Sequence, residues 1–147
     1  MRECKNVCGS ITVIIALNHC SIKALIMEIK KVNLQSKLET FNEHWTPKIV
    51  GELNNQHVKI AKLKGEFVMH NHEHEDELFY VIEGKLFIEL VDKTIELNSG
   101  EFVIIPKGVE HKPYAPEEVC VMLFEPTSTL NTGNKKNELT VSDLDEI

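Results

Sequence analysis

Short runs of apolar and alternating residues, separated by residues that favour turns, occupy most of the chain from Met27 onward. Glycine, proline and paired asparagine stand between these runs, as they do at the ends of β-strands. Many short strands separated in this way indicate an all-β sandwich or barrel. The strands that we expect span residues 48–53, 57–63, 67–72, 78–82, 85–91, 94–97, 102–105 and 119–125.

Other segments have weaker patterns. Residues 28–34 alternate charged and apolar side chains and could form an edge strand, whereas residues 37–45 predict a short helix or loop. We expect turns at Asn54-Asn55 and at Lys64-Gly65. Residues 140–147 could form one helical turn capped by a threonine.

The length of 147 residues fits one domain, and an apolar share of 42% is enough for a core. We expect residues 27–126 to form the barrel and residues 127–147 to form a polar tail. Residues 1–26 are interpreted as an extension or leader outside the core. The apolar run at residues 11–17 leaves a targeting segment as the alternative.

The composition narrows the classes of partner and the compartment. Sixteen basic against 23 acidic residues give a net charge of −7. No basic block stands out, which argues against a nucleic acid or an anionic membrane as partner. The four cysteines follow no common zinc spacing, and Cys120 lies in an apolar run as a buried thiol would, so we expect a reducing, cytoplasmic location.

The run at residues 78–82 is apolar on both faces of a strand. One face fills the barrel, and the other needs a cover, which favours a homodimer. Phe79, Phe87 and Phe102 are expected in the core rather than in contact with a substrate.

Three alternating histidines mark the stretch with the clearest chemistry. His70 and His72 lie on the same side of an extended strand, because successive side chains point to opposite faces. With Glu77 they would form a partial metal site. His74 alternates with His72 in the same way, so a His72–His74 pair is the alternative.

A second stretch, residues 100–111, could supply the missing ligand. Gly100 permits a tight turn, and Pro106 and Gly108 make another at the end of a strand. His111 follows directly and would complete a site of three histidines and one carboxylate.

These two stretches resemble the two signature motifs of the cupin superfamily. The first motif is represented by Gly65, His70, His72, Glu77 and Gly84. The spacing of this motif selects His70 over His74, which is then expected at the rim of the pocket or in solvent. Gly65 stands one residue closer to the first histidine than is usual.

The second motif is represented by Gly100, Pro106, Gly108 and His111, with Ala115 where the motif has asparagine. The resemblance covers residues 47–126, and the spacer between the motifs is similar to that of small single-domain bacterial cupins.

The resemblance implies a single-domain jelly-roll β-barrel with a divalent metal ion inside. The metal ligands that it implies are His70, His72, Glu77 and His111. Such a set suits Fe, Mn, Ni, Co, Cu or Zn, and leaves coordination positions open for a substrate or O₂.

The expected function is a small metalloenzyme that acts on a small polar molecule by dioxygenase- or isomerase-type chemistry. The alternative is a non-catalytic, metal-dependent domain that binds or senses a small molecule. Arg2 is the single arginine, and the scattered lysines form no phosphate-binding cluster, which argues against a sugar-phosphate isomerase.

Overall fold

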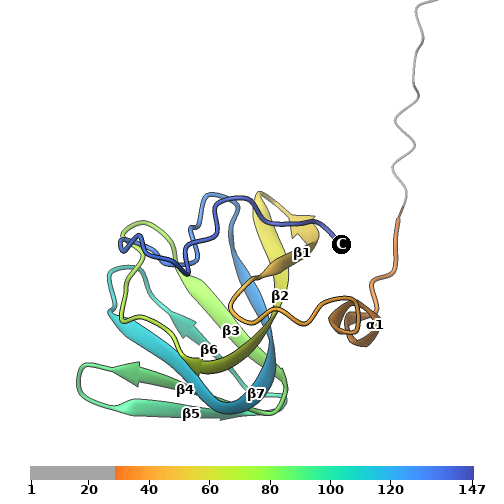
Figure 1. Cartoon of the computed structure of the whole chain (residues 1–147). Coiled ribbons are helices and arrows are strands. Elements are labelled where there is room, and N and C mark those ends of the chain that lie inside the picture. The colour runs from red at the N-terminus through yellow and green to blue at the C-terminus, as the bar shows by residue number, and fades with distance from the viewer. Residues whose placement is uncertain (1–28) are drawn as a thin grey trace, which may run out of the picture. The chain divides into compact units, whose positions relative to one another are not determined.

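Seven antiparallel strands wrap into a jelly-roll barrel in the computed structural model, which describes residues 29–147 (Figure 1). The predicted extension at residues 1–26 lies outside the described residues. A short helix precedes the strands. The elements are α1 (Leu34–Leu38), β1 (Lys48–Leu53), β2 (Gln56–Glu66), β3 (Glu77–Glu83), β4 (Lys85–Leu90), β5 (Thr94–Asn98), β6 (Phe102–Ile105) and β7 (His111–Pro126).

The long strand β7 joins the two halves of the barrel. Its first half pairs with β4, and its second half lies between β2 and β3. The sheet order is β1-β2-β7-β3-β6, with the β4–β5 hairpin attached through β7. One strand that changes partners along its length curls the sheet, so side chains from both halves face one interior.

Two turn predictions have different outcomes. Asn54 and Asn55 form the predicted turn between β1 and β2, with φ values of 52° and 62° that asparagine tolerates. We predicted that a turn at Gly65 ends a strand, and this prediction is wrong. Gly65 sits inside β2 with φ of 81°, where the register with β7 shifts, and so forms a bulge in a continuous strand.

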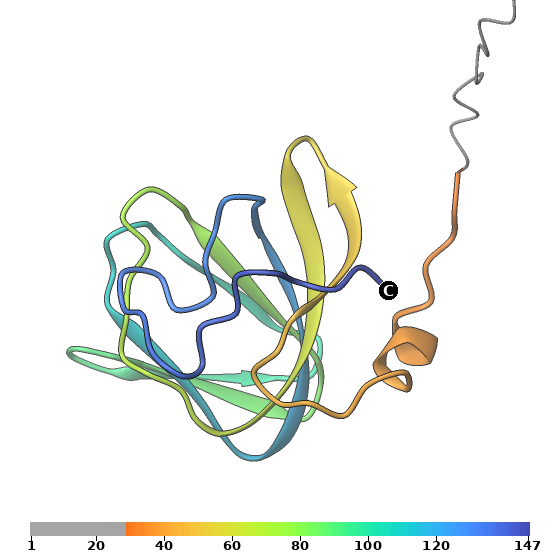
Figure 2. The same cartoon turned by 45° about the horizontal axis from the view of Figure 1, so that its top comes forward.

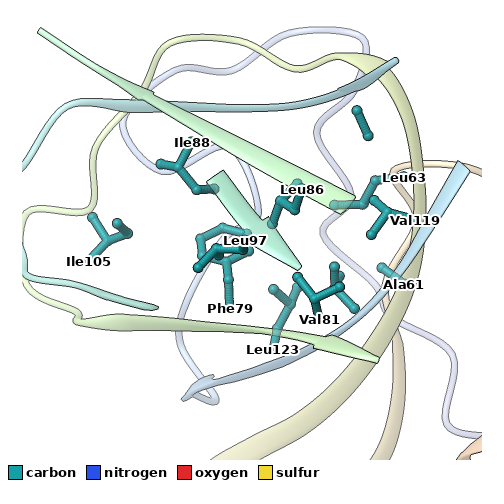
Figure 3. Close-up of a cluster of buried hydrophobic side chains, with 12 residues drawn as sticks. Ala61, Leu63, Phe79, Val81, Leu86, Ile88, Leu97, Ile105, Val119 and Leu123 are labelled. Atoms are coloured by element: carbon teal, nitrogen blue, oxygen red, sulfur yellow. The ribbon is translucent and has the colours of Figure 1, made fainter. Parts of the chain in front are cut away.

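Alternating side chains of the strands fill the barrel (Figure 3). Phe79 and Val81 on β3 point inward with Leu86 and Ile88 on β4, and all four are at most 3% exposed. The prediction of core phenylalanines is confirmed for Phe79 only.

The other two phenylalanines lie outside this core. Phe87 is half-buried and stacks on Tyr114, with ring centroids 5.0 Å apart. Phe102 is 60% exposed on β6. Both occupy outward positions of their strands, because their inward neighbours fill the barrel.

The N-terminal part of the described chain covers one outer face of the sheet. α1 and the residues after it place Leu38 and Phe41 against Val50, Ile60 and Cys120. The prediction that the thiol of Cys120 is buried is confirmed. The predicted edge strand at 28–34 is wrong for the described residues 29–34, because Asn33 caps a helix that starts at residue 34. The homodimer stays a prediction.

Residues 127–147 run across one end of the barrel and reach β1 (Figure 2). Thr132 is fully buried, and the amide of Ile147 donates to the carbonyl of Ile49. The helical turn predicted at residues 140–147 is absent, because these residues bond to other segments instead. No helix among residues 29–147 is long and apolar enough to cross a membrane.

Candidate metal centre

An isolated pair of backbone hydrogen bonds brings the two motifs together. The amide of His70 donates to the carbonyl of His111 at 3.0 Å, and the amide of His111 donates back at 2.9 Å. The amide of Gly108 also donates to the carbonyl of His72 at 2.7 Å. The predicted strand at 67–72 is therefore an extended segment with one β-bridge, at residue 70, and the amide of Phe67 also donates to the carbonyl of Pro113 in β7.

The strands direct the other two side chains inward. Glu77 is the first residue of β3 and shares the inward face with Phe79 and Val81. His111 is the first residue of β7 and alternates inward with Pro113. The side chains of Glu77 and His111 therefore point inward because side chains alternate along each strand and because each strand begins at that residue.

The structure places four donor groups together inside the barrel. One nitrogen or oxygen atom from each side chain lies within 4.8 Å of the others. The Nε2 atoms of His111 and His72 are 3.2 and 3.3 Å from Oε2 of Glu77. The four residues, none more than 4% exposed, are His70, His72, Glu77 and His111.

Backbone carbonyls orient two of the imidazole rings. Nδ1 of His70 donates to the carbonyl of Val68 at 2.9 Å, and Nδ1 of His111 donates to the carbonyl of Val109 at 3.0 Å. A carbonyl can only accept, so Nδ1 carries a hydrogen in both rings, and Nε2 of each ring faces the cluster.

The protonation states suit metal binding. Burial alone would raise the pKa of Glu77, but the neighbouring imidazoles of His111 and His72 lower that pKa to about 2. Burial and the neighbouring His111 lower the pKa of His70 to about 4. Burial also acts to lower the pKa of His72, but Glu77 outweighs it, and the pKa is raised. Two of the four donors, the Glu77 carboxylate and the His70 imidazole, are thus already in their ligand forms.

Two nitrogen atoms of the cluster have no hydrogen-bond partner among residues 29–147. They are Nε2 of His70 and Nε2 of His72, whose 3.3 Å approach to Glu77 lacks hydrogen-bond geometry. Buried polar atoms without a partner are rare and costly. A divalent ion would satisfy both, and three imidazoles with one carboxylate are donors that such an ion takes. The residues present therefore fit a metal ion.

His74, the alternative partner of His72, does not join the cluster. Its side chain is 82% exposed and lies near Glu73. The loop that carries it turns outward before β3 begins. That the four clustered residues bind a metal stays a prediction.

A narrow cavity of about 30 Å³ adjoins the cluster. Its walls are mostly apolar, and Trp45 and Phe67 stack in them with ring centroids 4.8 Å apart. Asn131, from the segment after β7, also lines it. The lining residues are Trp45, Pro47, Leu63, Phe67, His70, Glu77, Phe79, Pro113, Leu123, Glu125 and Asn131.

Sequence reasoning missed a buried ion pair beside this cavity. Glu125 lines the cavity, and Nζ of Lys59 donates to its Oε1 at 2.8 Å. Both side chains are 1% exposed. Burial, and then the negative charge of Glu77, raise the pKa of Glu125 to about 7 against the effect of Lys59. The alternation of side chains in β7 could have identified Glu125 as buried, because residue 125 is two positions after Leu123 and points to the same, inward face.

Comparison with known proteins places this chain in a family. The Cupin domain family matches residues 56–125. A cupin-2 domain containing protein from Shewanella frigidimarina is 47% identical, with a TM-score of 0.64, over 65% of this chain and 93% of that chain.

Two curated proteins are also similar. The uncharacterized protein YdbB of Bacillus subtilis is 41% identical over 64 residues, which are 43% of this chain and 57% of that protein. The 3-hydroxyanthranilate 3,4-dioxygenase of Xenopus laevis is 25% identical over an alignment of 101 residues that covers 64% of this chain and 36% of that enzyme. The matches thus span little more than half, or about a third, of these curated relatives.

Proposed function

The chain belongs to the cupin superfamily, and from that premise we propose that it is a metalloenzyme that acts on a small molecule. The observation that carries the proposal is the cluster of four buried donors, two of which have a nitrogen without a hydrogen-bond partner. The ion would be one of Fe, Mn, Ni, Co, Cu or Zn, because all accept imidazole and carboxylate ligands.

We favour dioxygenase-type chemistry. Bound there, the ion would supply a Lewis acid and, if redox-active, a site for O₂. The chain's own residues hold the donors in place, and the apolar walls around Trp45 and Phe67 leave little room for water in the cavity. The 25% identical relative from Xenopus laevis is named as a dioxygenase, which supports this choice.

The cavity also bears on the substrate. We expected a small polar molecule, but most of the walls are apolar, so a molecule with an apolar body and a few polar atoms fits them better. Isomerase-type chemistry on a sugar phosphate has less support, because neither lysine nor arginine lines the cavity.

The alternative is a metal-dependent binding or sensor domain without turnover. The observation that favours it is the size of the cavity, about 30 Å³, with Asn131 of the C-terminal segment in its wall. A volume of this size holds a water molecule or two. Turnover of a larger substrate would require the segment after β7, or Trp45, to move.

Oxygen uptake separates the two functions. The protein is loaded with Fe(II) without oxygen and then mixed with oxygen and small aromatic, keto or sugar compounds. An enzyme is expected to consume oxygen with one class of compound, and the His111→Ala variant is expected not to. Uptake at the same rate by both proteins, or by neither, would refute dioxygenase-type chemistry at this site.

A further inference from the structure

Glu125 has one carboxylate oxygen that no group in the described residues binds. Its Oε1 accepts a hydrogen bond from Lys59 at 2.8 Å, but its Oε2 has no hydrogen-bond partner. The residue is 1% exposed, so water at the surface does not replace the missing partner. An unpaired buried carboxylate oxygen is costly, and it needs a physical explanation.

The strand register places this carboxylate next to the candidate metal centre. Leu78 on β3 pairs with Phe124 on β7. Glu77 precedes Leu78 and Glu125 follows Phe124, so the two carboxylates take facing positions on neighbouring strands. Both line the same cavity with His70. A molecule bound at the metal centre would therefore lie against Glu125.

Lys59 holds the carboxylate from the side away from the cavity. It lies on β2, shares the inward face with Ala61 and Leu63, and is not among the residues that line the cavity. Its ammonium group occupies Oε1 and leaves Oε2 available. The pair thus offers one oriented acceptor in an otherwise apolar wall.

We propose that Glu125, oriented by Lys59, is the hydrogen-bond acceptor that recognises an N–H or O–H group on the molecule bound at the metal centre. The ligand class is a small molecule that offers metal-binding atoms on one side and a donor on the other. This inference rests on the proposed function, because it requires a ligand in the metal cavity.

A purely structural role explains the pair less well. A buried ion pair seldom stabilises a fold more than apolar side chains of similar volume do. A structural pair would also be expected to use both carboxylate oxygens. An acceptor kept for a ligand accounts for both features.

The test uses two probes that differ in one donor. Acetohydroxamate and N-methylacetohydroxamate both chelate metal ions through two oxygen atoms, but only the first has an N–H group. Their affinities are measured from the visible absorption of the Co(II)-loaded protein. The variant is Lys59→Met/Glu125→Met, which removes both charges and keeps the volume. The matched control is Lys48→Met/Asp145→Leu, which removes an ion pair of 2.7 Å outside the cavity.

The wild type and the control are expected to bind acetohydroxamate about tenfold more tightly than the methylated probe. The Lys59→Met/Glu125→Met variant should keep its Co(II) and lose this preference. The same preference in that variant, no preference in the wild type, or no binding of either probe would each overturn the role of Glu125. If the double variant does not fold, Glu125→Gln replaces it, and its neutral amide should reduce the preference by about threefold or more.

Metal content separates this inference from the proposed function. A wild type that retains neither Co(II) nor any of the other candidate ions refutes the metal centre itself. A wild type that retains Co(II), with a preference that the variant shares, refutes the recognition role of Glu125 alone.

Discussion

Gly133 holds the C-terminal segment against the metal-site loop, and replacing it with alanine should release that segment. Its φ of +51° is in the left-handed region, which favours glycine. A Cβ atom there would overlap the carbonyl oxygen of Asn71 and lie 3.2 Å from Cδ2 of His70. The obstacle is a backbone carbonyl, which cannot rotate away as a flexible side chain would.

The cost follows from the contacts that would be lost. The amide of Asn134 donates to the carbonyl of Asn71 at 3.0 Å, and the amide of Asn71 donates to Oδ1 of Asn134 at 3.3 Å. At about 1 kcal/mol for each hydrogen bond, their loss costs about 2 kcal/mol. Alanine at positive φ adds about 1 kcal/mol. We expect Gly133→Ala to reduce the free energy of unfolding by about 3 kcal/mol.

Gly100→Ala is the matched control. Gly100 has φ of +86°, but a Cβ atom there would meet nothing within 4 Å, so only the backbone cost of about 1 kcal/mol applies. Urea unfolding gives both free energies, and hydrogen exchange at the amide of Asn134 reports the release of the segment. Equal losses in the two variants, with unchanged exchange at Asn134, would show that the contact with Asn71 does not hold the segment.

The remaining predictions concern the metal site, the core and the metal-free protein. His111→Ala should lower the bound metal steeply, as measured by mass spectrometry, whereas His74→Ala should not, and equal losses would overturn the ligand assignment. Leu86→Ala, at a fully buried position, should cost about 2–5 kcal/mol in urea unfolding, against less than about 0.5 kcal/mol for Val91→Ala at a position that is 83% exposed. The pKa of His70 is lowered from 6.5 to about 4, so the folded metal-free protein binds fewer protons than the unfolded chain, and stability should fall as the pH drops through this range. Relative to the His70→Asn variant, the free energy of unfolding of the wild type should fall by about 3 kcal/mol over this range. Parallel profiles of unfolding free energy against pH for the two proteins would refute this prediction.

The strands and the two motifs were predictable because their signals are local. Alternation and turn residues place β1, β3 and β6 within a residue of the expected ranges. The motif spacing also selects the four residues that the structure brings together, and it leaves His74 outside them. These features depend on side-chain parity and on short turns, which a sequence shows directly.

The features that were missed depend on contacts between distant segments. The N-terminal half of β7, which begins at His111, has prolines and charges that hide a strand, but pairing with β4 stabilises it. Thr132 in the tail is buried and forms a hydrogen bond with Thr140, which the periodicity of apolar residues in the sequence does not predict. The pair of Lys59 and Glu125 is visible only when β2 and β7 lie side by side, since 66 positions separate the two residues.

The four buried side chains of His70, His72, Glu77 and His111 are expected to form one divalent-metal centre. The most direct test is to titrate the metal-free wild type anaerobically with Fe(II), Mn(II), Co(II), Ni(II), Cu(II) and Zn(II) in turn, and to measure the metal retained after gel filtration. We expect one equivalent of ion per chain for at least one metal, and we expect binding to release protons because the pKa of His72 is raised. Retention of no metal in any titration would contradict it.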